Sequence, residues 1–284
     1  MDIEHLRRQS VFLLILAALL WSSSGLCIKI IDWQPLSILS ARSLIAAVVF
    51  LVYLRHLSLR WTRLQLAGAF GYIGAQLFFI SATKLTTAAN AIFLQYTSPL
   101  YIVVLGYWLL GERPQRADWL SMPLIFAGML LFFGDELSFS GFSGNLLAIL
   151  SGMAMAVMVL CMRRQKAGVP GNTILLGNLL GALIGLPFLF QETFSLSSLG
   201  IVSYLGIFQI GLSFVFFSSA IKHVPALEST LILTLEPILN PVWVFMVIGE
   251  APGGFALVGG ALVLGAVTAR AVISARMLYP RRRN

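Results

Sequence analysis

Apolar runs of about 20 residues, long enough to cross a hydrocarbon core of about 30 Å as an α-helix, recur along the whole chain. Inside lipid the backbone must form its hydrogen bonds internally, so such runs are expected to be helical. Hydrophobic residues make up 58% of the chain and charged residues only 11%, whereas soluble domains carry roughly 25% charged residues. We therefore predict an all-α polytopic membrane protein.

Ten transmembrane helices can be drawn along the sequence. Their predicted ranges are 11–31, 36–54, 64–83, 87–110, 118–134, 144–162, 172–190, 199–220, 225–248 and 252–274. The first is expected to be a retained helix and not a signal peptide, because no small-residue cleavage site follows a short apolar core.

Two stretches within this pattern are variants of each other. Residues 82–114 and 220–252 align without a gap at an offset of 138, which places Pro99 on Pro237 and Gly-Glu at 111–112 on Gly-Glu at 249–250. A proline inside an apolar run, followed twelve residues later by Gly-Glu, is a rare pattern to meet twice. We infer an internal duplication.

The duplication divides the ten helices into two repeats of five. The first repeat is predicted over 11–134 and the second over 143–274, with cytoplasmic tails at 1–10 and 275–284. Because five is odd, the second repeat enters the membrane from the opposite side. Inverted repeats of this kind are typical of secondary transporters, whose substrate site lies near the midplane where the repeats meet.

Lysine and arginine are distributed unevenly between the predicted loops. With the N-terminus inside, sixteen of the nineteen basic residues fall on the inner face, Lys29 and Lys84 fall on the outer face, and Arg42 lies within the second helix. Basic loops remain cytoplasmic, so we predict a cell (plasma or inner) membrane protein with both termini cytoplasmic. This distribution also accounts for the net charge of +8 without a nucleic-acid partner.

Glu236 is the leading candidate for a functional residue. If the ninth helix begins at Pro225, eleven residues at about 1.5 Å each place Glu236 roughly 16 Å deep. Pro237 and Pro241 follow, and because proline has no N–H, carbonyls in the preceding turn lose helical partners. We interpret Glu236 as a site for a substrate ammonium group or a proton. The alternative is a protonated, structural glutamic acid that bonds between helices.

Uncharged polar and aromatic side chains fall in the same predicted layer and indicate a wet central cavity, although each could be a structural interhelical hydrogen bond. Together with Glu236, the predicted substrate-binding residues are Trp21, Ser22, Gln76, Asn90, Gln95, Tyr96, Gln209, Ser213 and Asn240. Trp21 and Tyr96 would add flat faces for an apolar or cationic substrate.

Other residues are expected to be structural. Arg42 lies about six residues into its helix, shallow enough for the side chain to extend outward to the headgroups. Small residues at intervals of four let membrane helices pack closely. Two such stripes are Gly177, Gly181 and Gly185 in the seventh helix, and Ala261, Gly265 and Ala269 in the tenth.

Signatures of enzymes are missing from the sequence. It contains no His-Glu-x-x-His, no Gly-x-Ser-x-Gly and no Walker glycine loop. The three histidines fall at predicted loops or helix ends, where they do not assemble a metal cluster. We therefore expect no catalytic residues, no cofactor and no metal.

Short motifs lie on the first two predicted helices and at the end of each repeat. They are Leu20-Trp21-Ser22, Ser40-Ala41-Arg42, Tyr96-Thr97-Ser98-Pro99 with Gly111-Glu112-Arg113, and Leu235-Glu236-Pro237 with Gly249-Glu250. In these motifs the chain, over roughly 11–274, resembles the EamA-type family of the drug/metabolite transporter superfamily. The resemblance implies ten helices, cytoplasmic termini and export of small metabolites such as amino acids. It also implies capping or gating at Glu112 and Glu250, and a sixth helix that lines the cavity, here with methionines.

We therefore expect a secondary transporter that exports amino acids or related amphipathic small molecules by alternating access around a midplane cavity. Pro99 and Pro237 are the expected hinges, Glu236 is expected to couple transport to protons, and the protein is expected to be a monomer or homodimer in the bilayer. The alternatives are a nucleotide-sugar or lipid-linked carrier of the same superfamily, a channel with a continuous polar stripe, and a membrane-embedded enzyme with a catalytic cluster near the headgroups.

Overall fold

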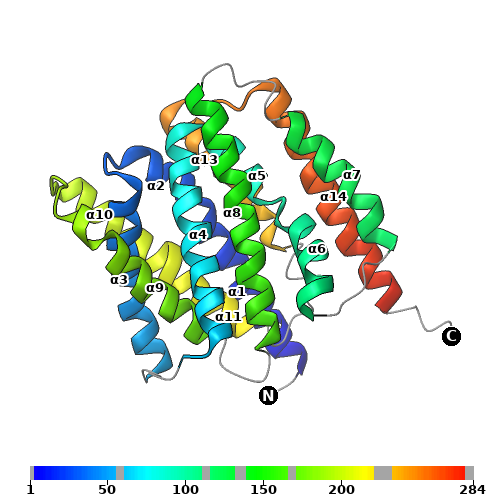
Figure 1. The fold of residues 1–284 in the computed structure, drawn as a ribbon, viewed down its shortest axis with the longest axis horizontal. Helices are drawn as coiled ribbons and strands as arrows, with labels where there is room; N and C mark the ends of the chain where they lie inside the picture. Colours follow the sequence, from blue (N-terminus) through cyan, green and yellow to red (C-terminus); the bar gives the residue numbers. More distant parts are fainter. Residues whose placement is uncertain are drawn as a thin grey trace.

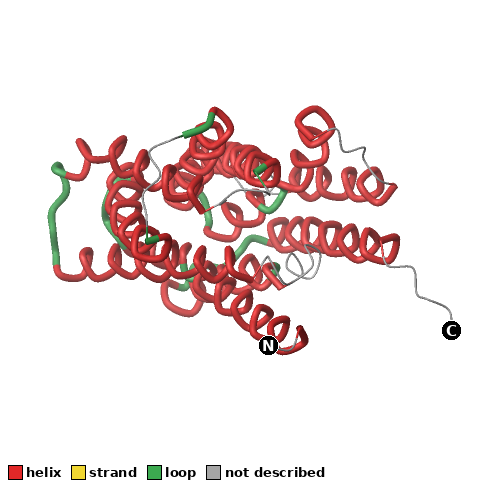
Figure 2. Tube along the Cα trace, turned by 90° about the horizontal axis from the view of Figure 1, so that it is seen from below, coloured by secondary structure: helices red, strands yellow, loops and turns green. Residues whose placement is uncertain are grey.

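The computed structural model describes residues 3–55, 61–110, 116–131, 139–165, 171–220 and 232–278, and within these ranges it contains helices and no strand (Figure 2). The first half of the chain forms α1 (Ile3–Ser22), α2 (Ser24–Ile30), α3 (Pro35–Leu54), α4 (Arg63–Leu85), α5 (Ala88–Gln95), α6 (Ser98–Leu110) and α7 (Arg116–Leu131). The second half forms α8 (Phe139–Arg164), α9 (Gly171–Leu189), α10 (Leu196–Tyr204), the π-helix η1 (Leu205–Leu212), α11 (Ser213–Ala220), α13 (Leu235–Ile248) and α14 (Gly254–Leu278).

Seven helical segments in the described ranges are long and apolar enough to cross a membrane. They are Arg8–Ile30, Pro35–Leu54, Arg63–Leu85, Ala88–Gly106, Gly141–Met162, Gly171–Leu189 and Leu196–Ala220. The three other predicted segments correspond to shorter apolar helices, Trp119–Gly128, Leu235–Ile248 and Gly254–Ala269. Large apolar side chains such as Val52, Phe190 and Met246 are more than two-thirds exposed, as expected of a surface that faces lipid. The chain is a multi-pass membrane protein.

If the two halves are equivalent, each contact between helices should have a counterpart in which the halves exchange roles, and the main contacts do. The packing of α4 on α8 has its counterpart in the packing of α1 on α11, and the packing of α5 and α6 on α8 has its counterpart in that of α13 on α1 and α2. The pairs α3–α9 and α7–α14 each join a helix to its equivalent in the other half. The helices α7 and α14 lie side by side at the edge of the molecule (Figure 1). This arrangement is consistent with a two-repeat design.

The first segments of the two halves run in opposite directions. The C-terminal end of the segment α1–α2 lies at the α4–α5 junction, where Lys29 donates to Thr86 O. By contrast, α8 begins close to that junction, since Gly144 in its second turn packs against Thr86. We call this end of the molecule, with the α2–α3, α4–α5, α9–α10 and α13–α14 connections, the Lys29 end.

Local hydrogen bonds explain several helix boundaries. Thr62 and Gln65 form a capping box that begins α4, and the Thr87 hydroxyl accepts from the Asn90 amide to begin α5. The predicted first helix is interrupted at Ser23, where the Ser22 and Ser23 hydroxyls donate to Leu19 O and Leu20 O. Such bonds to the preceding turn compete with the helical ladder and bend helices.

The small-residue prediction is confirmed for the seventh predicted helix and wrong for the tenth. On α9, a Cβ added at Gly185 would collide with the Leu36 carbonyl of α3, and one at Gly177 would lie 2.6 Å from the Tyr72 ring of α4. On α14, Gly265 has nothing within 4 Å, because that stripe faces outward and α14 packs on α7 through neighbouring residues. Spacing alone does not show which side of a helix faces a partner.

We predict that Gly185→Ala destabilises the protein by about 1–3 kcal/mol, because the added methyl group has to displace the backbone of α3. The measurement is thermal unfolding of the purified protein in detergent. Gly265→Ala is the matched control and should be neutral or stabilising by up to about 1 kcal/mol, through helix propensity alone. Equal unfolding temperatures for the two variants would contradict the packing described for α9.

Candidate functional site

Two helix breaks occupy equivalent positions in the two halves. The first lies at Tyr96–Thr97, between α5 and α6, and the second at Thr234, immediately before α13. The sequence offset of 138 places Tyr96 on Thr234. Pro99 and Pro237 each follow a break by three residues, and a proline leaves the carbonyl four residues earlier without its helical donor. Those carbonyls belong to Gln95 and Leu233.

Tyr96 connects the two breaks. Its hydroxyl lies 2.7 Å from Glu236 Oε2 and 3.1 Å from the Leu233 carbonyl oxygen. The carbonyl freed by Pro237 is therefore bonded by a side chain from the other half of the molecule. Glu236 is only 9% exposed. A tyrosine hydroxyl has a single proton, so it can donate fully to only one of these two acceptors at a time. We call Tyr96 and Glu236 the central pair.

The depth of the central pair can be counted from described helices. Pro225, from which the sequence count started, lies outside the described residues, and Glu236 lies in the first turn of α13. Twelve residues separate it from Ile248 at the Lys29 end, which corresponds to about 18 Å of helix. Tyr96 lies eight residues from Ala88 at the same end, or about 12 Å. Both counts place the pair well inside the molecule.

The other freed carbonyl faces a glycine. A Cβ on Gly152 of α8 would lie 2.9 Å from Gln95 O, so α8 approaches the break between α5 and α6 closely. The Gln95 side chain donates to Ser151 Oγ at 2.7 Å, and Ser151 donates to Ala75 O at 2.7 Å. The Gln95 side chain therefore links α5 to α8 in this structure. Met153, expected among the lining residues, is 42% exposed.

Polar residues at the α1–α2 break contact α13. Trp243 Nε1 donates to Ser22 Oγ at 2.9 Å, and Asn240 Nδ2 donates to Ser24 Oγ at 3.3 Å. Gly25 makes room for the Asn240 amide, because a Cβ there would collide with it. Asn240 Oδ1 is buried and has no hydrogen-bond partner, so this side chain keeps an acceptor available.

Trp21 and Gln209 also keep unused polar atoms. Trp21 Nε1 and Gln209 Oε1 are buried and have no hydrogen-bond partner. The Trp21 ring lies 5.0 Å from the Phe214 ring and 5.6 Å from that of Phe217. Ser213, by contrast, donates to Gln209 O at 2.5 Å within its own helical turn. Trp21 therefore keeps a free donor and Gln209 a free acceptor, whereas the Ser213 hydroxyl is already donated.

Arg42 does not extend outward to the headgroups as expected. Its side chain is 1% exposed, and Nη2 donates to Gln76 Oε1 at 2.5 Å. Close by, the Tyr72 hydroxyl donates to Asn178 Oδ1 at 3.0 Å. Arg42 points inward because its side of α3 packs against other helices, including η1, where a Cβ on Gly206 would lie 2.9 Å from Arg42 O. We call Arg42, Tyr72, Gln76 and Asn178 the Arg42 cluster.

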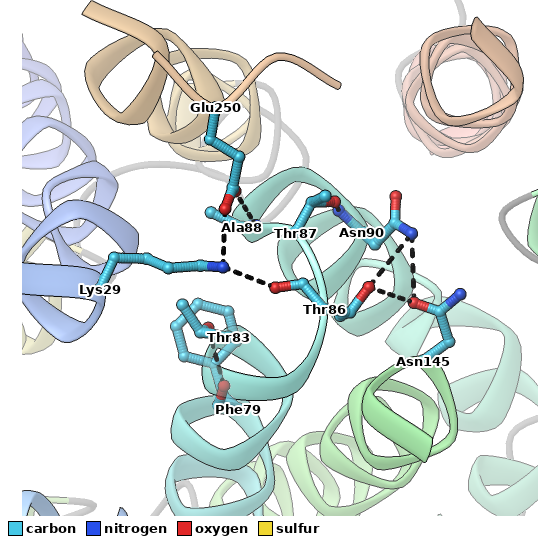
Figure 3. A network of polar contacts seen from close by, with 9 residues as sticks. All are labelled: Lys29, Phe79, Thr83, Thr86, Thr87, Ala88, Asn90, Asn145 and Glu250. Carbon is cyan, nitrogen blue, oxygen red and sulfur yellow. Dashed lines mark hydrogen bonds and ion pairs between the residues drawn. The ribbon is translucent and has the colours of Figure 1, made fainter. Parts of the chain in front are cut away.

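A polar network closes the Lys29 end (Figure 3). Lys29 Nζ lies 2.7 Å from Glu250 Oε2 and donates to Thr86 O at 2.8 Å, while Glu250 Oε1 accepts from the Ala88 amide at 2.8 Å. Lys29 lies at the C-terminal end of α4 and Glu250 at the N-terminal end of α5, so their charges complement the dipoles of these two helices. Asn90 lies here too, with Nδ2 3.2 Å from Asn145 Oδ1, and not in the central layer where it was predicted.

Some predictions fall on residues that the structure does not describe. Glu112 lies outside the described residues, and so does the side chain of Pro99. Sequence reasoning also missed the contacts that Lys29, Ser24 and Trp243 make between the two halves. A signal existed for Ser24, which belongs to the serine run after Trp21, and for Lys29, which is one of only two basic residues predicted outside. Within the described ranges no three His, Cys, Asp or Glu side chains form a metal site.

Comparisons with known proteins give a family, several transporter relatives and a matching fold. The model of the EamA-like transporter family matches residues 8–134 and 142–269. The uncharacterised transporter YyaM of Bacillus subtilis is 27% identical over 222 residues, 72% of each chain, and an uncharacterised transporter of Archaeoglobus fulgidus is 23% identical over 279 residues, 90% of this chain and 94% of its own. A solved structure with 24% identity superposes with a TM-score of 0.67 over 95% of this chain and 99% of its own, which supports the fold.

We predict that Tyr96→Phe destabilises the protein by about 1–2 kcal/mol, because it leaves the Leu233 carbonyl and the Glu236 carboxyl without their shared donor. Thermal unfolding in detergent measures the effect. Tyr53→Phe is the matched control, since that hydroxyl makes a single 3.3 Å contact with Ser219 at an exposed position, and it should change stability by less than about 0.5 kcal/mol. A Tyr96→Phe variant as stable as the control would show that the central pair carries no structural bond.

Proposed function

The chain belongs to the EamA-like transporter family, and from that premise we propose that it is a secondary transporter that exports small amphipathic metabolites such as amino acids by alternating access. The observation that carries the proposal is the central pair, in which a buried carboxyl group and a tyrosine from the two halves meet at two helix breaks. Discontinuous helices at the interface of two repeats are the usual construction of transporter substrate sites. Pro99 and Pro237 are the proposed hinges.

The geometry of the central pair supports proton coupling. When Glu236 is ionised it can only accept hydrogen bonds. It then accepts one from the Tyr96 hydroxyl and competes with Leu233 O for that donor. When Glu236 is protonated it becomes a donor, and Tyr96 is then free to donate to Leu233 O. The proton on Glu236 therefore decides how well the carbonyl at the start of α13 is bonded, which connects proton binding to the movement of this helix.

Few of the described titratable side chains lie on the helices around Glu236. Tyr96 is the one that touches it. The helices packed against α13 are α1, α2 and α5. Their other described titratable side chains are Arg8, Cys27 and Lys29, and Lys29 is engaged by Glu250. In the proposed mechanism Glu236 responds to protons and to a charged substrate.

The Lys29 network is the proposed outer gate. The excess of Lys and Arg on the other predicted face supports cytoplasmic termini in a plasma or inner membrane, and in that proposed orientation the Lys29 end lies outside. There the Lys29–Glu250 ion pair joins α2 to the end of α13, across the two repeats. Export requires this pair to separate. Both groups are partly exposed, at 18% and 23%, where an ion pair contributes little net stability and can open readily.

We predict that Glu236→Gln abolishes the pH dependence of transport while the protein remains folded, because the amide keeps the size of the carboxyl but does not titrate. A ligand is first found by thermal-shift screening against amino acids, amines, nucleosides and sugars, since ligands stabilise the folded state that binds them. Its flux into proteoliposomes is then measured across an imposed pH gradient. Glu192→Gln, which changes a carboxylate at the Lys29 end, is the control. Unaltered pH dependence in Glu236→Gln would reject the coupling role.

We also predict that a short, reducible cross-linker between Lys29→Cys and Glu250→Cys stops transport, because it holds the outer end closed. The experiment replaces Cys27 and Cys161 by serine and measures flux before cross-linking, after cross-linking and after reduction. Each single-cysteine variant treated with the same reagent serves as control. Wild-type flux through fully cross-linked protein would show that these residues do not form a gate.

A further inference from the structure

Arg42 is a buried cation to which the described part of the chain supplies no carboxylate. Among the side chains that are fully buried it is the largest, yet its one hydrogen bond is the neutral contact from Nη2 to Gln76 Oε1. Nη1 has no partner. Within the described part of the chain, no carboxylate pairs with it, and Glu236 bonds to Tyr96 instead.

Such an arrangement is costly unless something else completes it. A guanidinium group stays protonated in proteins and presents five N–H donors, and an unpaired charge at membrane depth is strongly unfavourable. Residues of this kind mark substrate or ion pathways in membrane proteins. The planar fork of arginine matches a carboxylate, which can accept two parallel hydrogen bonds from it.

The surroundings of the Arg42 cluster offer what an organic acid would need. The Tyr72 ring packs 5.9 Å from Phe214, which in turn packs 5.0 Å from Trp21. Trp21 Nε1 is a second buried donor without a partner. Together with the neighbouring Trp21 and Phe214, the Arg42 cluster therefore offers one positive charge, an additional N–H donor and aromatic faces, contributed by α1, α3, α4 and α11.

We propose that Arg42 is the anion subsite of the transport site and binds the carboxylate of a small amphipathic acid, with Trp21 as an additional donor and the aromatic rings as the apolar surface. A monoanion fits better than a phosphate dianion, because one guanidinium neutralises one charge. This inference rests on the proposed transport function and specifies its substrate class. Glu236, at a separate position, would then meet a cationic group of a zwitterionic substrate.

The test measures binding of matched compounds to the purified full-length protein by calorimetry. Leucine, phenylalanine and tryptophan are each compared with the primary amide and with the decarboxylated amine. At least one acid is expected to bind ten-fold or more tightly than its amide. Arg42→Gln should reduce that preference to near one, Arg42→Lys should retain part of it, and Trp21→Phe, which keeps an aromatic ring, should weaken it several-fold. Trp33→Phe is the matched control, since its Nε1 already donates to Thr193 O at the Lys29 end, and it should keep the preference.

Two results would overturn the proposal. One is that no acid binds more tightly than its amide, and the other is that Arg42→Gln and Trp21→Phe keep the wild-type preference. The same compounds are followed in proteoliposome flux, which separates this inference from the proposed function. Transport of amines or amides without preference for acids would remove the anion subsite but leave the transporter, whereas absence of flux for every class would remove the transport function itself.

Discussion

Two backbone carbonyls that prolines leave without helical donors impose the constraint on which the centre of this structure depends. In a membrane, water cannot satisfy such groups, so protein atoms must do so. Gln95 O lies against Gly152 of α8, and Leu233 O accepts from Tyr96. Because Tyr96 comes from the opposite half, the second break can be stabilised only when both halves are assembled. The helix break and the contact between the halves are thus one feature.

The two repeats solve this problem differently although they share a sequence pattern. At the residue before the proline, the first repeat has Ser98 and the second has Glu236. Similarly, Arg42 of α3 corresponds in the repeat alignment to Asn178 of α9, and both belong to the Arg42 cluster. At these two aligned positions, each repeat therefore contributes one acidic or basic side chain and one neutral polar side chain. A symmetric backbone carries an asymmetric distribution of charge.

Much of this could be predicted from the sequence, because apolar length and proline position act locally. The helical segments, the inverted order of the halves and the choice of Glu236 follow from such local signals. The sequence did not show that Arg42 points inward, that Gly265 faces outward or that Asn90 lies at the Lys29 end. Each of these depends on the rotation of one helix against another, which a depth count along a single helix does not contain. The partners Lys29 and Glu250 are 221 residues apart, so no local pattern connects them.

The hydrogen bonds from Trp243 and Asn240 to Ser22 and Ser24 have a mechanical consequence. They join α13 to the serine break between α1 and α2, at a point roughly midway between the central pair and the proposed outer gate. Glu250 follows α13 and Lys29 belongs to α2, so both partners of the proposed gate are carried by helices that are bonded to each other at the serines. If the gate opens, the two helices would turn about this point, and a small rotation there would separate Lys29 and Glu250 by a larger distance.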